Sequence, residues 1–270
     1  MSQILACRSR WLAACLVLAL SSVAGWTASA WATAPEYGRC LKAEKVGTEY
    51  KGEFKDSKCT KEVPGSERAK KGKYEWLPGT PPNTKMTTSG GKGTLETVGK
   101  LGVSCTTETS VGEFSGTKEA KNIVVTFNGC ESGGISCSTA GSARGELVTK
   151  SLEGVIGWEN KAKKEVAFDL YPEGKTGLFI EFACSALTFA VRGSVLVPLK
   201  PVDKMLASMT LKYKASKGVQ QLTHFEGGAE DILETSHKGL PYEQSGQTIT
   251  TVLTNGEKEK PEKLELNAVV

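Results

Sequence analysis

The sequence predicts an all-β protein, and three observations support this class. Apolar and polar residues alternate with a period of two in several segments, which directs neighbouring side chains to opposite faces of a strand. The chain contains 30 glycines and 10 prolines, as many turns require. Residues 229–237 are the one weak helical candidate. We predict a large, jelly-roll-like β-sandwich of roughly 12–16 strands with an N-terminal elaboration closed by a disulfide.

The predicted strands follow from this alternation in chain order. The clearest segment is 207–214, where Ala207, Met209, Leu211 and Tyr213 are predicted to face the core. Asn-Gly and Gly-Gly pairs separate the alternating segments, as turns do. The other predicted strands are 101–107, 123–127, 166–170, 177–184 and 264–268.

Residues 1–34 have the order of a secretory signal peptide. Arg8 and Arg10 precede an apolar run over residues 12–25, and small residues follow up to Ala34. The run is shorter than the about 20 residues that a membrane-spanning helix needs. We therefore predict a secreted or extracytoplasmic protein with no transmembrane span in the mature chain.

Residues 35–270 are predicted to form one domain with two parts. Residues 35–80 form an N-terminal β subregion, and residues 81–270 form the main β-sandwich. A loop rich in Pro, Thr and Gly separates the two parts. Because so short an N-terminal piece would bury little core alone, we expect it to pack on the rest.

Six cysteines follow the predicted signal peptide, and an even number in an exported chain predicts disulfides. Two of the pairs we expect close short loops, and the third joins two predicted strands. A zinc site is the alternative, but the chain has no Cys-x-x-Cys motif and only His224 and His237 as further ligands. No metal site is therefore predicted. The predicted pairs are Cys40–Cys59, Cys130–Cys137 and Cys105–Cys184.

The charge pattern disfavours nucleic acid as a partner. The net charge is only +4, and charges of both signs are interspersed along the chain. The sequence also lacks the Gly-x-Ser-x-Gly, His-Glu-x-x-His and phosphate-loop motifs of common enzyme classes. We predict no cofactor.

Aromatic residues provide one candidate binding site. Tyr74 and Trp76 share a face of a predicted strand, and Trp158 is a further candidate. Exposed aromatic rings on such folds commonly bind sugars, so cell-wall or extracellular polysaccharide is the predicted partner. The competing interpretation places these rings in the core.

Two carboxylates provide a catalytic alternative. Alternation places Glu181 and Asp169 opposite the apolar faces of their strands. If these strands were neighbours, the two acids would flank a cleft, as glycoside hydrolysis requires. Charged residues on the solvated outside of a sheet explain the same pattern.

Six short segments carry a resemblance to a known group of sequences. The chain resembles exported actinobacterial proteins of unknown function. The resemblance implies an exported origin and supplies no catalytic residues. The segments are residues 36–40, 72–76, 127–130, 145–149, 225–228 and 263–267.

These observations predict an exported, non-catalytic β-sandwich protein that acts by binding or structural association at the cell surface or in the medium. A carboxylate-dependent glycoside hydrolase is the alternative.

Overall fold

The computed structural model describes residues 35–65, 71–226, 228, 230–257 and 260–268. The predicted signal peptide, residues 1–34, lies outside the described residues and stays a prediction. Within the described ranges, no helix is long and apolar enough to cross a membrane.

Strands make up almost all the regular structure of the described residues, which confirms the all-β class. The segments with clear alternation lie in strands, as predicted. The bounds are β1 (Glu36–Lys42), β2 (Lys45–Val46), β3 (Glu49–Tyr50), β4 (Tyr74–Pro78), β5 (Lys85–Gly90), β6 (Gly93–Thr97), β7 (Gly102–Cys105), β8 (Thr107–Ser115), β9 (Glu119–Asn128), β10 (Glu131–Ser132), β11 (Ile135–Ser138), β12 (Leu147–Val148), β13 (Leu152–Asn160), β14 (Glu165–Pro172), the 3-10 helix η2 (Glu173–Lys175), β15 (Leu178–Cys184), β16 (Leu187–Gly193), β17 (Val195–Leu199), β18 (Ser208–Tyr213), β19 (Ala215–Ser216), β20 (Val219–Gln220), β21 (Leu233–His237), β22 (Glu243–Glu257), β23 (Lys260–Pro261) and β24 (Glu265–Asn267).

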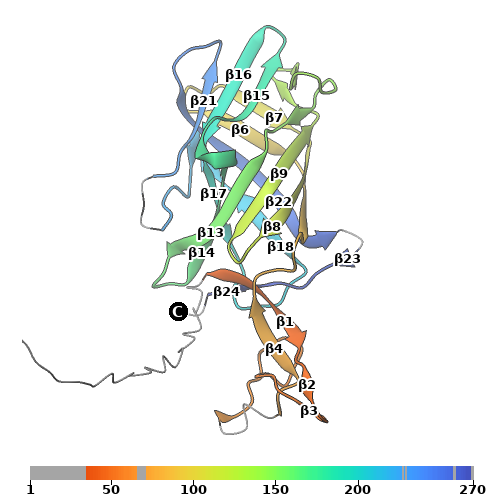
Figure 1. Cartoon of the computed structure of the whole chain (residues 1–270). Helices are drawn as coiled ribbons and strands as arrows, with labels where there is room; N and C mark the ends of the chain where they lie inside the picture. The colour runs from red at the N-terminus through yellow and green to blue at the C-terminus, as the bar shows by residue number, and fades with distance from the viewer. Residues whose placement is uncertain (1–34, 66–70, 227, 229, 258–259, 269–270) are drawn as a thin grey trace, which may run out of the picture. The chain divides into compact units, whose positions relative to one another are not determined.

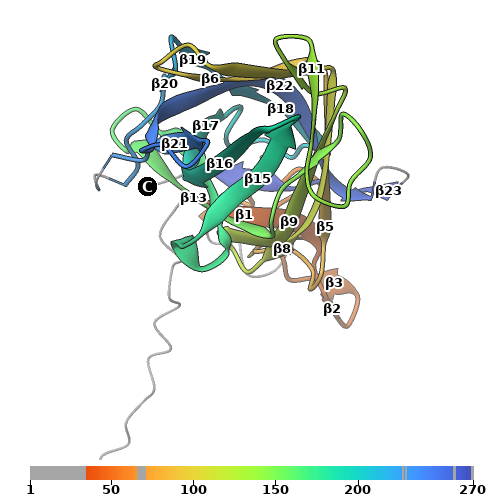
Figure 2. The same cartoon turned by 90° about the horizontal axis from the view of Figure 1, so that it is seen from above.

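Eight of these strands form a sheet that closes on itself. Antiparallel pairings run in the order β22–β6–β7–β10–β11–β15–β16–β21 and return to β22. Seen from above, the strands encircle an interior (Figure 2). This arrangement differs from the predicted jelly-roll-like sandwich. Alternation shows only that one face of a strand is buried, so it does not distinguish two packed sheets from one closed sheet.

A second series of strands extends this closed sheet along β22. Antiparallel pairings in this series run in the order β18–β22–β5–β8–β9–β13–β14–β17. Residues 245–248 of β22 pair with β6, whereas residues 251–255 pair with β5. Because one strand of 15 residues belongs to both series, their inward faces share one interior (Figure 1).

The N-terminal strands join the C-terminal end of the chain. Strand β1 pairs with β24 on one side and with β4 on the other. The Tyr37 ring is buried and meets the Phe114 ring edge-on, at 4.9 Å between centroids. The predicted N-terminal subregion therefore contacts strand β8, and it falls in the same compact unit as the other described residues.

The disulfides confirm one predicted pair and correct two. Cys40 pairs with Cys59 as predicted. The other bonds are Cys105–Cys130 and Cys137–Cys184, so the predicted pairs Cys130–Cys137 and Cys105–Cys184 are wrong. Cys137 and Cys184 lie directly opposite each other on β11 and β15. Strand order, which spacing along the chain does not reveal, decides these partners.

Two smaller predictions also need correction. The weak helical candidate over 229–237 contains no helix among its described residues, because Leu233–His237 is strand β21, paired with β16 and β22. The strand count exceeds the predicted range of roughly 12–16 because several strands, such as β2 and β10, have only 2 residues.

Candidate functional site

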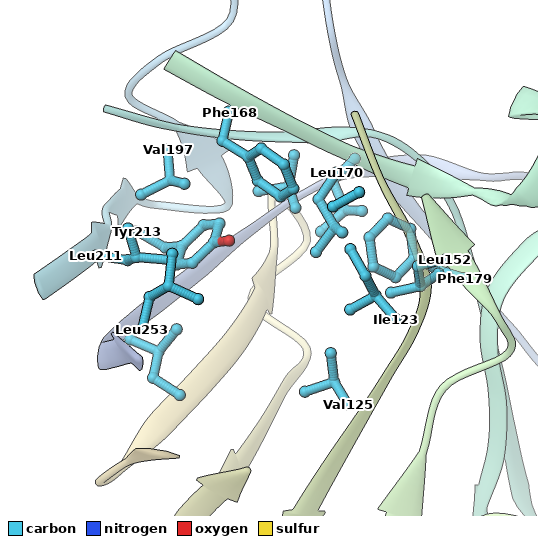
Figure 3. Packing of buried hydrophobic residues seen from close by; sticks show 14 of the residues in the cluster. Ile123, Val125, Leu152, Phe168, Leu170, Phe179, Val197, Leu211, Tyr213 and Leu253 are labelled. Carbon is cyan, nitrogen blue, oxygen red and sulfur yellow. The ribbon is translucent and has the colours of Figure 1, made fainter. Parts of the chain in front are cut away.

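The interior shared by the closed sheet and the second series of strands contains a cavity of about 110 Å³. Most of its lining is apolar and comes from the inward positions of many strands. Figure 3 shows Ile123, Phe168, Leu170, Phe179 and Tyr213 directed into this interior from β9, β14, β15 and β18. An engineered apolar cavity of about 150 Å³ in another protein binds benzene. The cavity described here therefore suits a small, largely apolar molecule.

The wall of the cavity depends on a glycine in β13. Gly154 packs against the Phe168 ring, and a Cβ atom at this position would lie only 2.0 Å from the Cζ atom of Phe168. Any larger residue at position 154 would therefore displace the ring. Because Phe168 lines the cavity, Gly154 helps to determine its shape.

One carboxyl group faces this apolar interior. Glu108 lies on β8 and is only 4% exposed. Its Oε1 atom accepts a hydrogen bond from Thr88 Oγ1 at 2.5 Å, and its Oε2 atom accepts one from Thr251 Oγ1 at 2.6 Å. Ser110 Oγ lies 2.6 Å from Thr88 Oγ1 and extends this group of hydroxyls. We call Glu108, Thr88, Ser110 and Thr251 the interior polar cluster.

Burial dominates the electrostatics of the interior polar cluster. Loss of hydration raises the pKa of Glu108, and the hydroxyl donors of Thr251 and Thr88 lower it in part. The pKa of Tyr213 is also raised, chiefly by burial and secondarily by the charge of Glu108. Among the described residues, no lysine or arginine forms an ion pair with Glu108.

The hydrogen bonds of Glu108 leave acceptor capacity toward the cavity. An ionised carboxylate offers about four lone-pair positions, and the two hydroxyl donors use two of them. A buried carboxylate without a cation is unfavourable unless further donors reach it. The site can therefore accept a hydrogen-bond donor or a positive charge from a bound molecule.

The structure does not form the predicted aromatic surface from Trp76, Tyr74 and Trp158. Trp158 is only 7% exposed and belongs to the core. It lies opposite Val166, an inward residue of β14, which explains its burial. Trp76 is half-buried, and its Nε1 atom donates a 2.7 Å hydrogen bond to Glu265 Oε2. Tyr74 lies on the same strand and is also half-buried.

The predicted carboxylate pair is not assembled either. Glu181 is exposed on β15, which pairs with β11 and β16. Asp169 lies on β14, which pairs with β13 and β17, and is only 3% exposed. Neither acid lines the interior cavity. Alternation placed Asp169 on the correct outer face of its strand but gave no sign that this face is covered.

The burial of Asp169 is explained by a segment that we call the covering segment. It consists of residues 222–226 and 230–232. Glu226 Oε1 accepts a 2.8 Å hydrogen bond from the Trp158 backbone N–H, and Ser194 Oγ donates to Asp231 Oδ1 at 2.7 Å. Burial first, and the charge of Asp231 second, raise the pKa of Asp169 to about 7, while Lys175 opposes the shift. The Oδ1 atom of Asp169 is buried without a hydrogen-bond partner.

The interior polar cluster is not evident from the sequence pattern. In β8, polar residues occupy both faces near Glu108, so alternation of polarity is absent there. Glu108 shares the inward register of Ser110 and Phe114, and this relation becomes visible only when the burial of the strand is known.

Comparison with known protein families, curated proteins and solved structures finds no match. Within the part of the chain that the structure describes, no group of three or more His, Cys, Asp or Glu side chains is arranged to hold a metal ion. The interior cavity and its carboxyl group are therefore the basis for a functional inference.

Proposed function

We propose that this protein is an exported, non-catalytic binding protein that holds a small apolar molecule carrying a protonated amine in its interior cavity. The observation that carries the proposal is the position of Glu108, a buried carboxyl group that lines an otherwise largely apolar cavity. Three disulfides support the export part of the proposal, because such bonds persist mainly in oxidising compartments.

The two ends of such a ligand match the two parts of the cavity. Apolar surface removed from water contributes about 25 cal/mol per Å², which favours a hydrocarbon group against Phe168 and Leu170. An ammonium group would form a charge-assisted hydrogen bond with Glu108, a contact that is about twice as strong as a neutral one. The hydroxyls of Thr88 and Thr251 hold the carboxylate in place for this contact.

Calorimetric titration with three probes of equal size tests the proposal. Benzylamine, benzyl alcohol and ethylbenzene share an aromatic ring and differ in the terminal group. We expect all three to bind, with benzylamine about tenfold tighter than ethylbenzene because a hydrogen bond to a charged group contributes about 1.5–3 kcal/mol before the ammonium loses its hydration. The preference for benzylamine should weaken toward low pH, where Glu108 becomes protonated.

Two variants separate the roles of the carboxylate and the cavity. In Glu108→Gln, benzylamine should lose its advantage while ethylbenzene binding persists. In Val125→Phe, the larger side chain should fill the cavity and weaken binding of all three probes. The matched control is Val252→Phe, which adds the same ring at a position of β22 that is 43% exposed, and it should leave binding unchanged.

Two results would overturn the proposal. The first is that none of the probes binds to the folded wild-type protein at concentrations up to their solubility. The second is that Val125→Phe and Val252→Phe bind all probes equally well, which would place the probes outside the interior.

A further inference from the structure

A groove on the outside of the sheet has a volume of about 560 Å³. Its walls come from the outward positions of β17 and β18 and from residues 220–222. Thr210 and Lys212 alternate with the buried residues Met209 and Leu211, so the same alternation that builds the core directs them outward. This groove is separate from the interior cavity because the two share no lining residue.

Lysines dominate the charge of this groove. Lys200, Lys212 and Lys214 line it and are all exposed, whereas Glu159 is the one acid in its lining. Among the described residues, no carboxylate oxygen lies within 4.0 Å of the ammonium group of any of these three lysines. The groove therefore presents positive charge that the protein does not neutralise by direct ion pairs.

The spacing of the lysines suits repeated negative charges. Lys212 and Lys214 are two residues apart along an extended chain, so their backbone positions are about 6.5 Å apart. Lys200 comes from a different part of the lining, directly after β17. A linear polymer lying along the groove would therefore meet three positive charges contributed by two segments of the chain.

We infer that this groove binds a linear anionic polysaccharide whose charge comes from repeated carboxylate or phosphate groups. The hydroxyl group of Thr210 and the amide group of Gln221, both exposed, also line the groove and match the hydroxyls of a sugar chain. The lining contains no aromatic side chain on which a base would stack, which disfavours single-stranded nucleic acid. The site is independent of the proposed ligand of the interior cavity.

Binding to defined polymers at several salt concentrations tests this inference. The probes are polygalacturonate, which carries carboxylates, phosphorylated dextran, which carries phosphate groups, and neutral dextran. We expect at least one anionic polymer to bind and dextran not to bind. Affinity should fall as salt increases, because exposed charges are screened beyond about 10 Å at 0.1 M salt. The anionic polymer that binds identifies the source of the charge.

A charge-matched pair of variants locates the binding site. The groove variant combines Lys200→Gln, Lys212→Gln and Lys214→Gln. The control combines Lys55→Gln, Lys58→Gln and Lys61→Gln, which remove the same charge from exposed positions of the N-terminal subregion. Since one exposed ion pair contributes up to about fivefold in affinity, the groove variant should bind about tenfold more weakly and the control within about twofold of wild type.

Three results would overturn the inference. The first is equal weakening of binding in the groove variant and the control, which would indicate attraction by net charge alone. The second is binding of dextran as tight as that of the anionic polymers. The third is no binding of either anionic polymer at low salt. Thermal unfolding of both variants must match that of the wild type for the comparison to hold.

Discussion

Two buried carboxyl groups on opposite faces of the sheet have different surroundings. Glu108 faces the interior, where hydroxyls from two neighbouring strands donate to both of its oxygens. Asp169 faces outward under the covering segment, where its Oδ1 atom has no partner and Asp231 lies near. Burial raises the pKa of both groups.

The difference shows how hydrogen bonding decides what a buried acid contributes. The hydroxyl donors stabilise the charged form of Glu108, and they also orient the carboxylate toward the cavity. Asp169 lacks comparable donors and faces a second acid, so its charged form is unfavourable in the folded protein. We associate the first environment with ligand binding and the second with a dependence of stability on pH.

The largest expected effect comes from replacing Asp169 by asparagine. The pKa of Asp169 is about 7 in the folded protein and near 3.8 when unfolded, so the folded state binds the proton more tightly. Its stabilising contribution is fully present below about pH 4 and is lost as pH rises through 7. Since each pKa unit corresponds to about 1.4 kcal/mol, Asp169→Asn should be more stable than wild type by about 2–4 kcal/mol at pH 8.

Urea unfolding at pH 4, 6 and 8 measures this difference. The gain for Asp169→Asn should grow with pH across this range and be small at pH 4. Glu181→Gln is the control, because it removes an exposed carboxylate from β15 and should change stability by less than about 0.5 kcal/mol. A gain that does not vary with pH would contradict the account of Asp169.

A smaller effect is expected from removing one donor to Glu108. Thr251→Val keeps the shape of the side chain but leaves Oε2 of Glu108 without its hydroxyl partner. An unsatisfied buried acceptor should reduce the free energy of unfolding by about 1–3 kcal/mol. Chemical denaturation at neutral pH measures the loss.

The neighbouring residue provides the matched control for this donor. Thr250 is exposed on the other face of β22, so Thr250→Val should change stability by less than about 0.5 kcal/mol. Equal losses in both variants would show that the hydroxyl of Thr251 is not important for Glu108.

The smallest expected effect concerns Glu265, an acid with one strong donor. Its pKa is raised mainly by burial, and the Trp76 indole lowers it in part. Trp76→Phe removes the 2.7 Å hydrogen bond and should destabilise the protein by about 1 kcal/mol. Tyr74→Phe, on the same strand, should have a smaller effect in the same thermal or chemical unfolding experiment. Equal destabilisation by Trp76→Phe and Tyr74→Phe would show that the hydrogen bond from Trp76 to Glu265 makes no measurable contribution to stability.

Alternation in the sequence predicts the faces of strands well. Met209, Leu211 and Tyr213 are buried as predicted, because a strand with one apolar face has to turn that face inward. The all-β class and the Cys40–Cys59 pair follow from equally local information. Such local patterns depend on a few consecutive residues.

Closure of the sheet and the location of the site depend on pairings between distant residues. Cys137 meets Cys184 because β11 pairs with β15, and Glu108 meets Thr251 because β22, β5 and β8 lie in succession. Trp158 is inward for a similar reason, since its partner across the sheet is Val166. No short segment of the sequence contains these relations.

A crystal structure of the protein grown with benzylamine tests directly whether the interior cavity is the ligand site. We predict that the aromatic ring lies in this cavity, in contact with Phe168 and Leu170, and that the nitrogen lies within hydrogen-bond distance of the Glu108 carboxylate. Benzylamine bound only on the outside, or an interior that holds only water at saturating benzylamine, would contradict the assignment of this cavity as the ligand site.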